Sequence, residues 1–245
     1  IANLVQVQGD FVSVLGTDGD DDFLFNASTG RQIMINEVSY EFSEEQAWEI
    51  EFDGGEGYDT VILRDSPGDE SLEAWPAAAV LSNDGEDGVT DFTVSVHAFE
   101  EMHAYANRDG HDTATLHDSE ANDKFKAEPA EDYAKMYGGA VYNRVKFFDV
   151  VEAHSSGGSD LARVFDTTGN DLFEGQKDTS RLSGQGFDVL AHGFGYVIAY
   201  ASEGRDAATF VDSALKDEFH AKPWKSQLFD IAGDVYKITA RRFDS

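Results

Sequence analysis

The feature that most constrains this chain is an internal repeat marked by aspartates. Four aspartates begin units 53, 48 and 46 residues apart, and a second aspartate follows each of them six residues later. The leading residues are Asp59, Asp112, Asp160 and Asp206, and the second are Asp65, Asp118, Asp166 and Asp212. A large apolar residue stands seven positions beyond each second aspartate, at Leu72, Phe125, Phe173 and Phe219. Chance does not produce so many shared offsets, so we predict a repeat protein with one structure common to its units.

Short β-forming segments lie between these anchors, each bounded by Gly, Asp, Asn or Ser. They are residues 60–63, 94–96, 113–116, 145–148, 161–165, 196–200 and 209–211. No helical period of any length is present. The sequence predicts an all-β fold, a parallel β-solenoid (β-helix or β-roll-like) of about four repeats of 46–53 residues. The four large apolar positions would form one buried ladder. Each repeat would hold one large coil or two ordinary coils, and a blade-like or sandwich arrangement of antiparallel hairpins is the main alternative.

The repeat also predicts the organisation of the chain. Residues 1–53 are expected to form an N-terminal β cap, with a hairpin of residues 33–35 and 38–42 around Asn36 and Glu37. Residues 54–245 form the array, with units starting near residues 54, 107, 156 and 203. Phe243 matches the positions of Phe99, Phe148 and Phe194 in earlier units. An interrupted last unit is expected either in a piece of a longer chain or where a surface meets a neighbour.

The charge is strongly acidic: 48 Asp and Glu residues against 18 Lys and Arg give a formal net charge of −30. Binding to nucleic acid is therefore not expected, because an anionic partner requires a basic face on the protein. Membrane insertion is not expected either, because no run of 18 apolar residues exists. Bound divalent cations, a high-salt habitat and an extracellular surface each explain such acidity. The chain has no cysteine. In a secreted protein without disulfides, Ca²⁺ is the usual substitute.

Glycine-rich turns supply the predicted metal ligands. Residues 54–62 match the nonapeptide G-G-x-G-x-D-x-U-x, and residues 16–24 match it except at Thr17. The glycines permit a tight turn, and turn carbonyls and carboxylates offer a hard cation the oxygens it prefers. The predicted Ca²⁺ ligands are Asp18, Asp20, Asp22, Asp53, Gly55, Gly57, Asp59, Asp112, Asp160 and Asp206. For Asp65, Asp118, Asp166 and Asp212 we favour a side-chain role in closing turns.

The same residues carry two resemblances. Residues 54–62, with reduced copies at 156–160 and 203–206, resemble the RTX-type calcium-binding repeats of secreted bacterial proteins. Residues 54–245 are similar to long repeat regions of large secreted and cell-surface proteins of planctomycete-like bacteria, through segments such as 112–119 and 170–173. The resemblances imply bound Ca²⁺ and a surface or matrix location, and they bring no catalytic residues.

We therefore expect an extracellular, calcium-binding structural or adhesive protein of a surface layer, matrix or filament. It would associate end to end, with Phe243 docking on the N-terminal strands of another copy, and surface-matrix components or polysaccharide are further expected partners. The alternative is a polysaccharide-acting β-helix enzyme of the lyase or epimerase type, or a non-catalytic carbohydrate-binding module. Its candidate residues are His103 with Tyr105, or His192 with Tyr196 and Tyr200. The seven histidines lack ligand spacing, so no zinc site is predicted.

Overall fold

The structure, a computed structural model, describes residues 4–28, 30–43, 46, 48–84, 90–139, 141–232 and 235–245. The described residues form strands and a single 3-10 helix, η1 (Pro129–Glu131). The predicted all-β fold is confirmed. No helix in the described ranges is long and apolar enough to cross a membrane.

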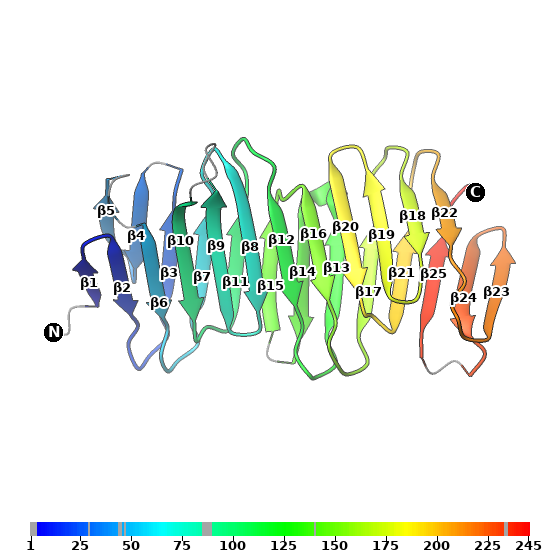
Figure 1. Cartoon of the computed structure of the whole chain (residues 1–245), viewed down its shortest axis with the longest axis horizontal. Coiled ribbons are helices and arrows are strands. Elements are labelled where there is room, and N and C mark those ends of the chain that lie inside the picture. Colours follow the sequence, from blue (N-terminus) through cyan, green and yellow to red (C-terminus); the bar gives the residue numbers. More distant parts are fainter. Residues whose placement is uncertain are drawn as a thin grey trace. The chain divides into compact units, whose positions relative to one another are not determined.

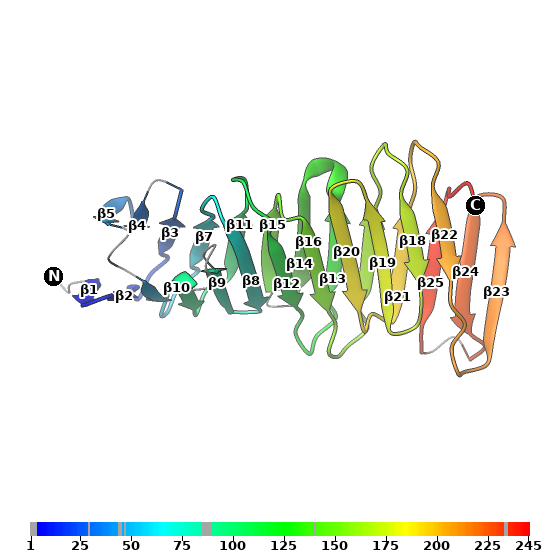
Figure 2. The ribbon, with the colours of Figure 1, turned by 45° about the horizontal axis from the view of Figure 1, so that its top comes forward.

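The chain divides into two compact units, each built from two β-sheets. Unit 1 is Ile1–Ala114 with Ala140–Phe148, and unit 2 is Thr115–Gly139 with Asp149–Ser245. Within each unit the sheets enclose the apolar side chains that alternate along every inner strand. Both ribbon views show the strands of each unit as two layers (Figures 1 and 2).

Unit 1 has six strands in each sheet. Sheet 1A has the order β1 (Val5–Gln8), β2 (Phe11–Leu15), β6 (Glu49–Asp53), β10 (Thr90–His97), β9 (Ala78–Asp84), β8 (Asp69–Trp75). Sheet 1B has the order β15 (Val141–Lys146), β11 (Glu101–Tyr105), β7 (Thr60–Arg64), β3 (Asp22–Asn26), β4 (Arg31–Ile35), β5 (Val38–Phe42).

Unit 2 repeats this plan. Sheet 2A has the order β12 (Thr113–His117), β16 (Val150–His154), β20 (Phe187–His192), β19 (Thr179–Gly184), β18 (Leu172–Gly175), β22 (Ala207–Phe210). Sheet 2B has the order β23 (Asp217–Lys222), β24 (Lys225–Asp230), β25 (Lys237–Arg241), β21 (Tyr196–Tyr200), β17 (Leu161–Phe165), β13 (Lys124–Glu128), β14 (Tyr133–Gly138).

One repeat contains three crossings between sheets. In unit 2, β17 lies in sheet 2B, the antiparallel meander β18–β19–β20 lies in sheet 2A, and β21 returns to sheet 2B. Unit 1 does the same with β7, the meander β8–β9–β10 and β11. Single strands stack in parallel, as in β17 with β21, so each unit is a β-solenoid with hairpins inserted into its coils. The repeat is thus one and a half turns, and the two predicted architectures are combined.

Because each repeat crosses between the sheets an odd number of times, equivalent residues of successive repeats lie alternately in the two sheets. Phe125 lies on β13 of sheet 2B, Phe173 on β18 of sheet 2A and Phe219 on β23 of sheet 2B. Phe219 is also 53% exposed. The predicted ladder of Leu72, Phe125, Phe173 and Phe219 is therefore wrong. The observed ladders join consecutive strands of one sheet, as in Phe125, Ala162, Val197 and Ile238.

The predicted strands and the predicted hairpin are present. The hairpin joins β4 and β5, with Asn36 and Glu37 at φ values of 49° and 67°, as a turn of two left-handed residues requires. The first six strands are not set apart from the rest, because β6 pairs with β10 and β3 pairs with β7. Residues 1–53 therefore share their sheets with the array.

Candidate metal centres

Each repeat carries an acidic turn with a regular sequence, [Asp/Gly]-[Ser/Thr]-x-x-[Asp/Asn/Lys]-[Asp/Glu]. We call these the acid turns; they are residues 16–21, 65–70, 118–123, 166–171 and 212–217. The second residue closes the turn onto the last. In the third turn, Ser119 donates its N–H (2.9 Å) and its hydroxyl (2.6 Å) to Asp123 Oδ2. Thr167 and Asp171 make the same pair of bonds in the fourth. A short hydroxyl side chain is needed because it reaches the carboxylate four residues later.

A second turn, rich in glycine, stacks on each of the first four acid turns. These glycine turns are residues 55–59, 108–112, 156–160 and 202–206. The acid turn 118–123 and the glycine turn 156–160 are joined by three backbone N–H bonds to carboxylate or amide oxygens. Ser156 donates to Asp118 Oδ1 (2.9 Å), Ser159 donates to Asn122 Oδ1 (2.8 Å), and Asp123 donates to Asp160 Oδ1 (2.7 Å).

The same three bonds recur in both units. Arg108, His111 and Glu70 donate to the side chains of Asp65 (2.6 Å), Asp69 (2.8 Å) and Asp112 (2.8 Å). Ser202, Arg205 and Asp171 donate to Asp166 (2.8 Å), Asn170 (2.9 Å) and Asp206 (3.0 Å). The first aspartate of an acid turn therefore binds the neighbouring turn, whereas we predicted that it would close its own.

Glycine is required where the two turns touch. Gly158 and Gly204 have φ values of 83° and 122°, in the left-handed region. A Cβ at either position would overlap a carbonyl oxygen of the acid turn beneath, Ala121 O or Gly169 O. The glycines of the nonapeptide-like pattern thus allow two backbones to approach closely.

Three acid turns and their glycine turns bring three buried carboxylates together. Triad 1 is Asp65, Glu70 and Asp112, triad 2 is Asp118, Asp123 and Asp160, and triad 3 is Asp166, Asp171 and Asp206. In each, one carboxylate oxygen per residue lies within 4.8 Å of the other two. Each triad lies inside one unit.

The negative charge of the triads has no protein counter-charge in unit 2. No carboxylate of triads 2 and 3 forms a salt bridge within the described residues, and all six are at most 6% exposed. Each triad also holds a buried carboxylate oxygen without a hydrogen-bond donor in the described structure. These atoms are Asp65 Oδ1, Glu70 Oε2, Asp123 Oδ1 and Asp171 Oδ1. Such groups are costly in a folded protein unless a cation or a proton neutralises them.

The protonation of the triads reflects this cost. Burial raises the pKa of Asp65 and of Asp166 to about 6 and the pKa of Glu70 to about 7. Burial likewise raises the pKa of Asp118, although Ser156 donates two hydrogen bonds to that carboxylate. Oxygens that share one Ca²⁺ at 2.3–2.6 Å lie at most about 5 Å apart. The spacing and the chemistry of the triads therefore both suit a hard divalent cation.

The predicted ligands divide into two groups. Asp112, Asp160 and Asp206 each belong to a triad. Asp18, Asp20, Asp22, Asp53, Gly55, Gly57 and Asp59 belong to no group of three ligating side chains within the described residues. Asp20 Oδ1 instead accepts the N–H of Tyr58 at 2.9 Å, and Asp53 Oδ1 accepts the N–H of Gly55 at 3.2 Å. Asp59 Oδ1 accepts the N–H of Asp21 at 2.8 Å, and Gly16 stands where a third carboxylate would be.

Six triad residues were missing from the predicted ligand set: Asp65, Glu70, Asp118, Asp123, Asp166 and Asp171. The six-residue offset and the acidic block that follows it marked most of them in the sequence. Glu70 was hidden because Asp69 was aligned with Asp123. The structure instead gives Asp69 the role of Asn122, since both accept an N–H from the glycine turn.

Of the two residue sets suggested for carbohydrate chemistry, the structure separates one and keeps the other together. His192 ends β20 in sheet 2A, whereas Tyr196 and Tyr200 lie on β21 in sheet 2B. Both strands point these side chains away from the buried core, so the three cannot share a site. His103 and Tyr105 do lie on one face of β11, where His103 Nε2 is 2.8 Å from Glu101 Oε1.

The two nonapeptide-like segments lie side by side in unit 1. A Cβ at Gly57 would come 2.7 Å from Gly19, and Tyr58 bonds to Asp20 across the same contact. Turns 38 residues apart in sequence therefore stack directly. No protein-family model matches this chain, and no curated protein matches it significantly.

Proposed function

We propose that this chain is an extracellular structural or adhesive protein whose stacked turns are held together by Ca²⁺. The observation that carries the proposal is the threefold recurrence of a buried carboxylate triad, with no salt bridge to triads 2 and 3 from any described side chain. Three formal charges in one buried cluster repel one another, and a divalent cation removes that repulsion. The absence of cysteine and the net charge of −30 fit the same role for the metal. A surface layer, matrix or filament is the setting in which a rigid repeat of this kind serves.

Unfolding with and without Ca²⁺ tests this proposal. We expect the melting temperature to fall when a chelator replaces Ca²⁺ at constant ionic strength, and high NaCl should not restore it. Asp118→Asn and Asp166→Asn should each remove part of the Ca²⁺ effect. Glu203→Gln is the matched control, because Glu203 is exposed in the glycine turn that contains Asp206. A melting temperature that responds to total salt alone would overturn the metal role.

We further propose that copies associate end to end through opposite charge and apolar contact. Residues 216–245 hold six Lys and Arg against five Asp and Glu, whereas residues 1–60 hold one against 14. The edge strands β22 and β23 of unit 2 border a hollow of about 340 Å³ lined by Phe210, Phe219 and Leu228. Trp224, between β23 and β24, is 57% exposed. The ring centroid of Phe243, which we expect to dock on another copy, lies 6.0 Å from that of Phe173 in the same unit.

Sedimentation at increasing protein concentration tests the association. We expect self-association that weakens in 1 M NaCl and in the double variant Phe219→Ser/Trp224→Ser. Tyr196→Ser, which removes a side chain that is 42% exposed on sheet 2B, is the control and should associate normally. If the chain stays monomeric at all concentrations in the presence of Ca²⁺, end-to-end association is excluded.

One observation favours the alternative, a carbohydrate-binding module or polysaccharide-acting enzyme. A hollow of about 310 Å³ in unit 1 is lined by Arg31, Trp48 and Asp91, among others. Trp48 is 42% exposed, and its ring centroid lies 5.5 Å from the Arg31 guanidinium carbon. Sugars stack on exposed aromatic faces, so loss of polysaccharide binding in Trp48→Ala would support this alternative over the structural role.

A further inference from the structure

A second kind of ligand cluster lies on the outer face of sheet 2A, apart from the triads. It consists of Glu152 and His154 on β16 and His192 on β20. The two strands are parallel neighbours, and their register places His154 directly beside His192. Glu152 is two residues before His154, so both side chains point to the same face.

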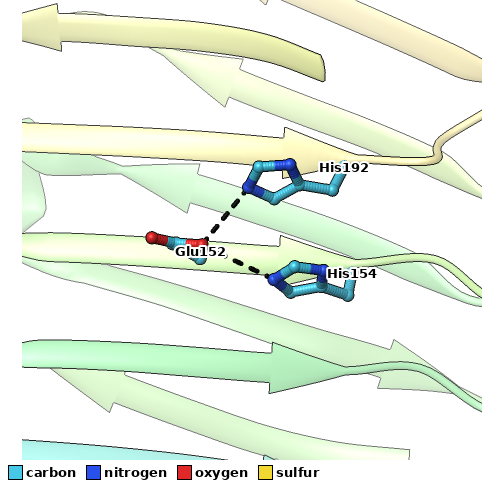
Figure 3. A group of neighbouring side chains, drawn as sticks. All are labelled: Glu152, His154 and His192. Atoms are coloured by element: carbon cyan, nitrogen blue, oxygen red, sulfur yellow. Dashed lines mark ion pairs between the residues drawn. The ribbon is translucent and has the colours of Figure 1, made fainter. Parts of the chain in front are cut away.

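One ligand atom of each of the three side chains lies within 4.8 Å of the other two. Glu152 Oε2 lies 3.5 Å from His154 Nε2 and 3.3 Å from His192 Nε2 (Figure 3). The two imidazoles are stacked, with centroids 4.4 Å apart and planes 13° from parallel, so one ring has to turn about its Cβ–Cγ bond for both Nε2 lone pairs to face the same ion. Ligand atoms on a tetrahedral zinc ion, with bonds of about 2.0–2.2 Å, lie about 3.3–3.6 Å apart. The two distances to Glu152 already match that spacing.

The surroundings prepare the imidazoles for a metal. His192 Nδ1 is 3.1 Å from Thr179 Oγ1, and when Nδ1–H donates to that hydroxyl the Nε2 lone pair faces Glu152. His192 Nε2 is a buried atom with no hydrogen-bond partner in the part of the chain that the structure describes.

Two other Glu-x-His pairs in the chain serve as internal references. Glu101 lies 2.8 Å from His103 on β11, and Glu218 lies 3.1 Å from His220 on β23. Neither belongs to a group of three ligating side chains in the described residues. The pair Glu152/His154 differs because strand register adds a second imidazole. An ordinary carboxylate–histidine ion pair is complete with two residues, so His192 is an addition that the other two pairs lack.

We propose that His154 Nε2, His192 Nε2 and the Glu152 carboxylate bind one divalent transition-metal ion of the zinc class, with water at the remaining positions. Two imidazoles and one carboxylate select such ions over Ca²⁺, which takes oxygen ligands. Water-filled positions on a solvent-facing sheet leave the ion open to a further ligand. The site does not depend on the triads or on the proposed structural role.

Zn²⁺ titration of the full chain by calorimetry, with Ca²⁺ present in excess to occupy the carboxylate triads, tests the proposal. We expect one Zn²⁺ per chain, and Co²⁺ in its place should give a visible absorption band. Loss of a residue that only hydrogen-bonds to a metal ligand weakens metal binding roughly 10–100-fold. His154→Ala and His192→Ala each remove a ligand itself, so each should weaken Zn²⁺ binding by more than this. Glu152→Gln should also weaken binding, and Thr179→Val should do so by about tenfold.

His103→Ala and His220→Ala are the matched controls, because each breaks a Glu-x-His pair without touching the cluster. Imidazole NMR provides a readout that needs no variant: Zn²⁺ should shift the ring signals of His154 and His192 and leave those of His103 and His220 in place. Unfolding curves show whether each variant is folded. Absence of Zn²⁺ binding would overturn the site. So would a Zn²⁺ affinity in His154→Ala and His192→Ala that equals the affinity of the unchanged chain.

Discussion

The acid turns 16–21 of unit 1 and 118–123 of unit 2 have matching backbone contacts and different charge. Asp21 N–H donates to Asp59 at 2.8 Å, just as Asp123 N–H donates to Asp160 at 2.7 Å. The first turn nevertheless has Gly16 where the other has Asp118. The two turns therefore stack even when the first position of the acid turn carries no carboxylate. Backbone geometry alone does not explain why the other three turns bury an aspartate at this position.

The two turns also differ in what faces the last acid. The amide of Asn36 donates to Asp21 Oδ1. Opposite Asp123 stands Gly138, where a Cβ would lie only 2.9 Å from Asp123 Oδ1, and that oxygen has no donor in the described residues. In triad 1, Asn83 donates to Glu70 Oε1 at 2.7 Å, but Glu70 Oε2 and Asp65 Oδ1 have no donor in the described residues. The first turn therefore buries two carboxylates, Asp21 and Asp59, whereas each triad buries three.

The largest expected effect separates these turns by their response to Ca²⁺. With free Ca²⁺ at 100 times Kd, each site adds about 2.7 kcal/mol. For a chain of this size that corresponds to about 5–10 °C in melting temperature. Asp118→Asn should lose about one site's contribution to the Ca²⁺-dependent increase in melting temperature, and Asp21→Asn should lose none of it. Calorimetric unfolding with Ca²⁺ and with chelator measures both, and equal losses would remove the distinction between the turns.

The next effect is the pH dependence of the metal-free protein. Burial raises the pKa of Asp65 and Asp166 to about 6 and that of Glu70 to about 7. Between about pH 4 and pH 7 the folded chain then binds more protons at these groups than the unfolded chain. Their contribution to stability is therefore present at low pH and is lost as the pH rises through 6–7, by at most about 1.4 kcal/mol per pH unit for each group.

Urea unfolding in chelator at pH 5 and at pH 7.5 measures this slope. The double variant Asp65→Asn/Asp166→Asn should flatten it, because amides do not titrate. Glu203→Gln removes one exposed charge and controls for the general effect of net charge. An unchanged slope in the double variant would show that the triads do not titrate as buried carboxylates.

A smaller effect tests the close approach of the turns. Gly204→Ala places a Cβ onto Gly169 O at a φ of 122°, and we expect a loss of about 1–3 kcal/mol from strain. Gly186→Ala is the control, because Gly186 has a φ of 81° but no atom within 4 Å of its Cβ position. Thermal unfolding should rank Gly204→Ala as the more damaging. The reverse order would mean that the turns do not stack as closely as described.

The smallest effect is expected at Asp20 and Asp69. Both accept an N–H through one side-chain oxygen, as Asn122 and Asn170 do in unit 2. Asp20→Asn and Asp69→Asn keep that acceptor, so stability should change by no more than about 0.5 kcal/mol. The Ca²⁺ response should also be unchanged. A lost Ca²⁺ response in Asp20→Asn would restore the turn carboxylates of residues 18–22 as ligands.

Local patterns were enough to predict much of the fold. Alternating segments such as 60–63 and 161–165 became β7 and β17, and the Asn36-Glu37 turn formed the expected hairpin. The repeat and its aspartates were visible because fixed offsets survive without any knowledge of contacts. These features depend on residues close in sequence, where the rules of strands and turns apply directly.

The sites could not be predicted in full, because their members are distant in sequence. Asp118 and Asp123 share a turn, but Asp160 joins them only when a coil closes 37 residues later. His154 and His192 have no ligand spacing in sequence and meet through the parallel register of β16 and β20. Glu70 was passed over because only the contact with Asp112 shows which of two adjacent acids points inward.

The sequence by itself determined that the chain is an all-β repeat with acidic, glycine-rich turns. Only the tertiary structure decided which sheet each strand joins. Three crossings per repeat move every equivalent residue to the opposite sheet, so Phe125 and Phe173 never share a ladder. The physical reason is that a strand's own residues specify its alternation of buried and exposed positions, while its neighbours depend on how many times the chain has crossed between the layers.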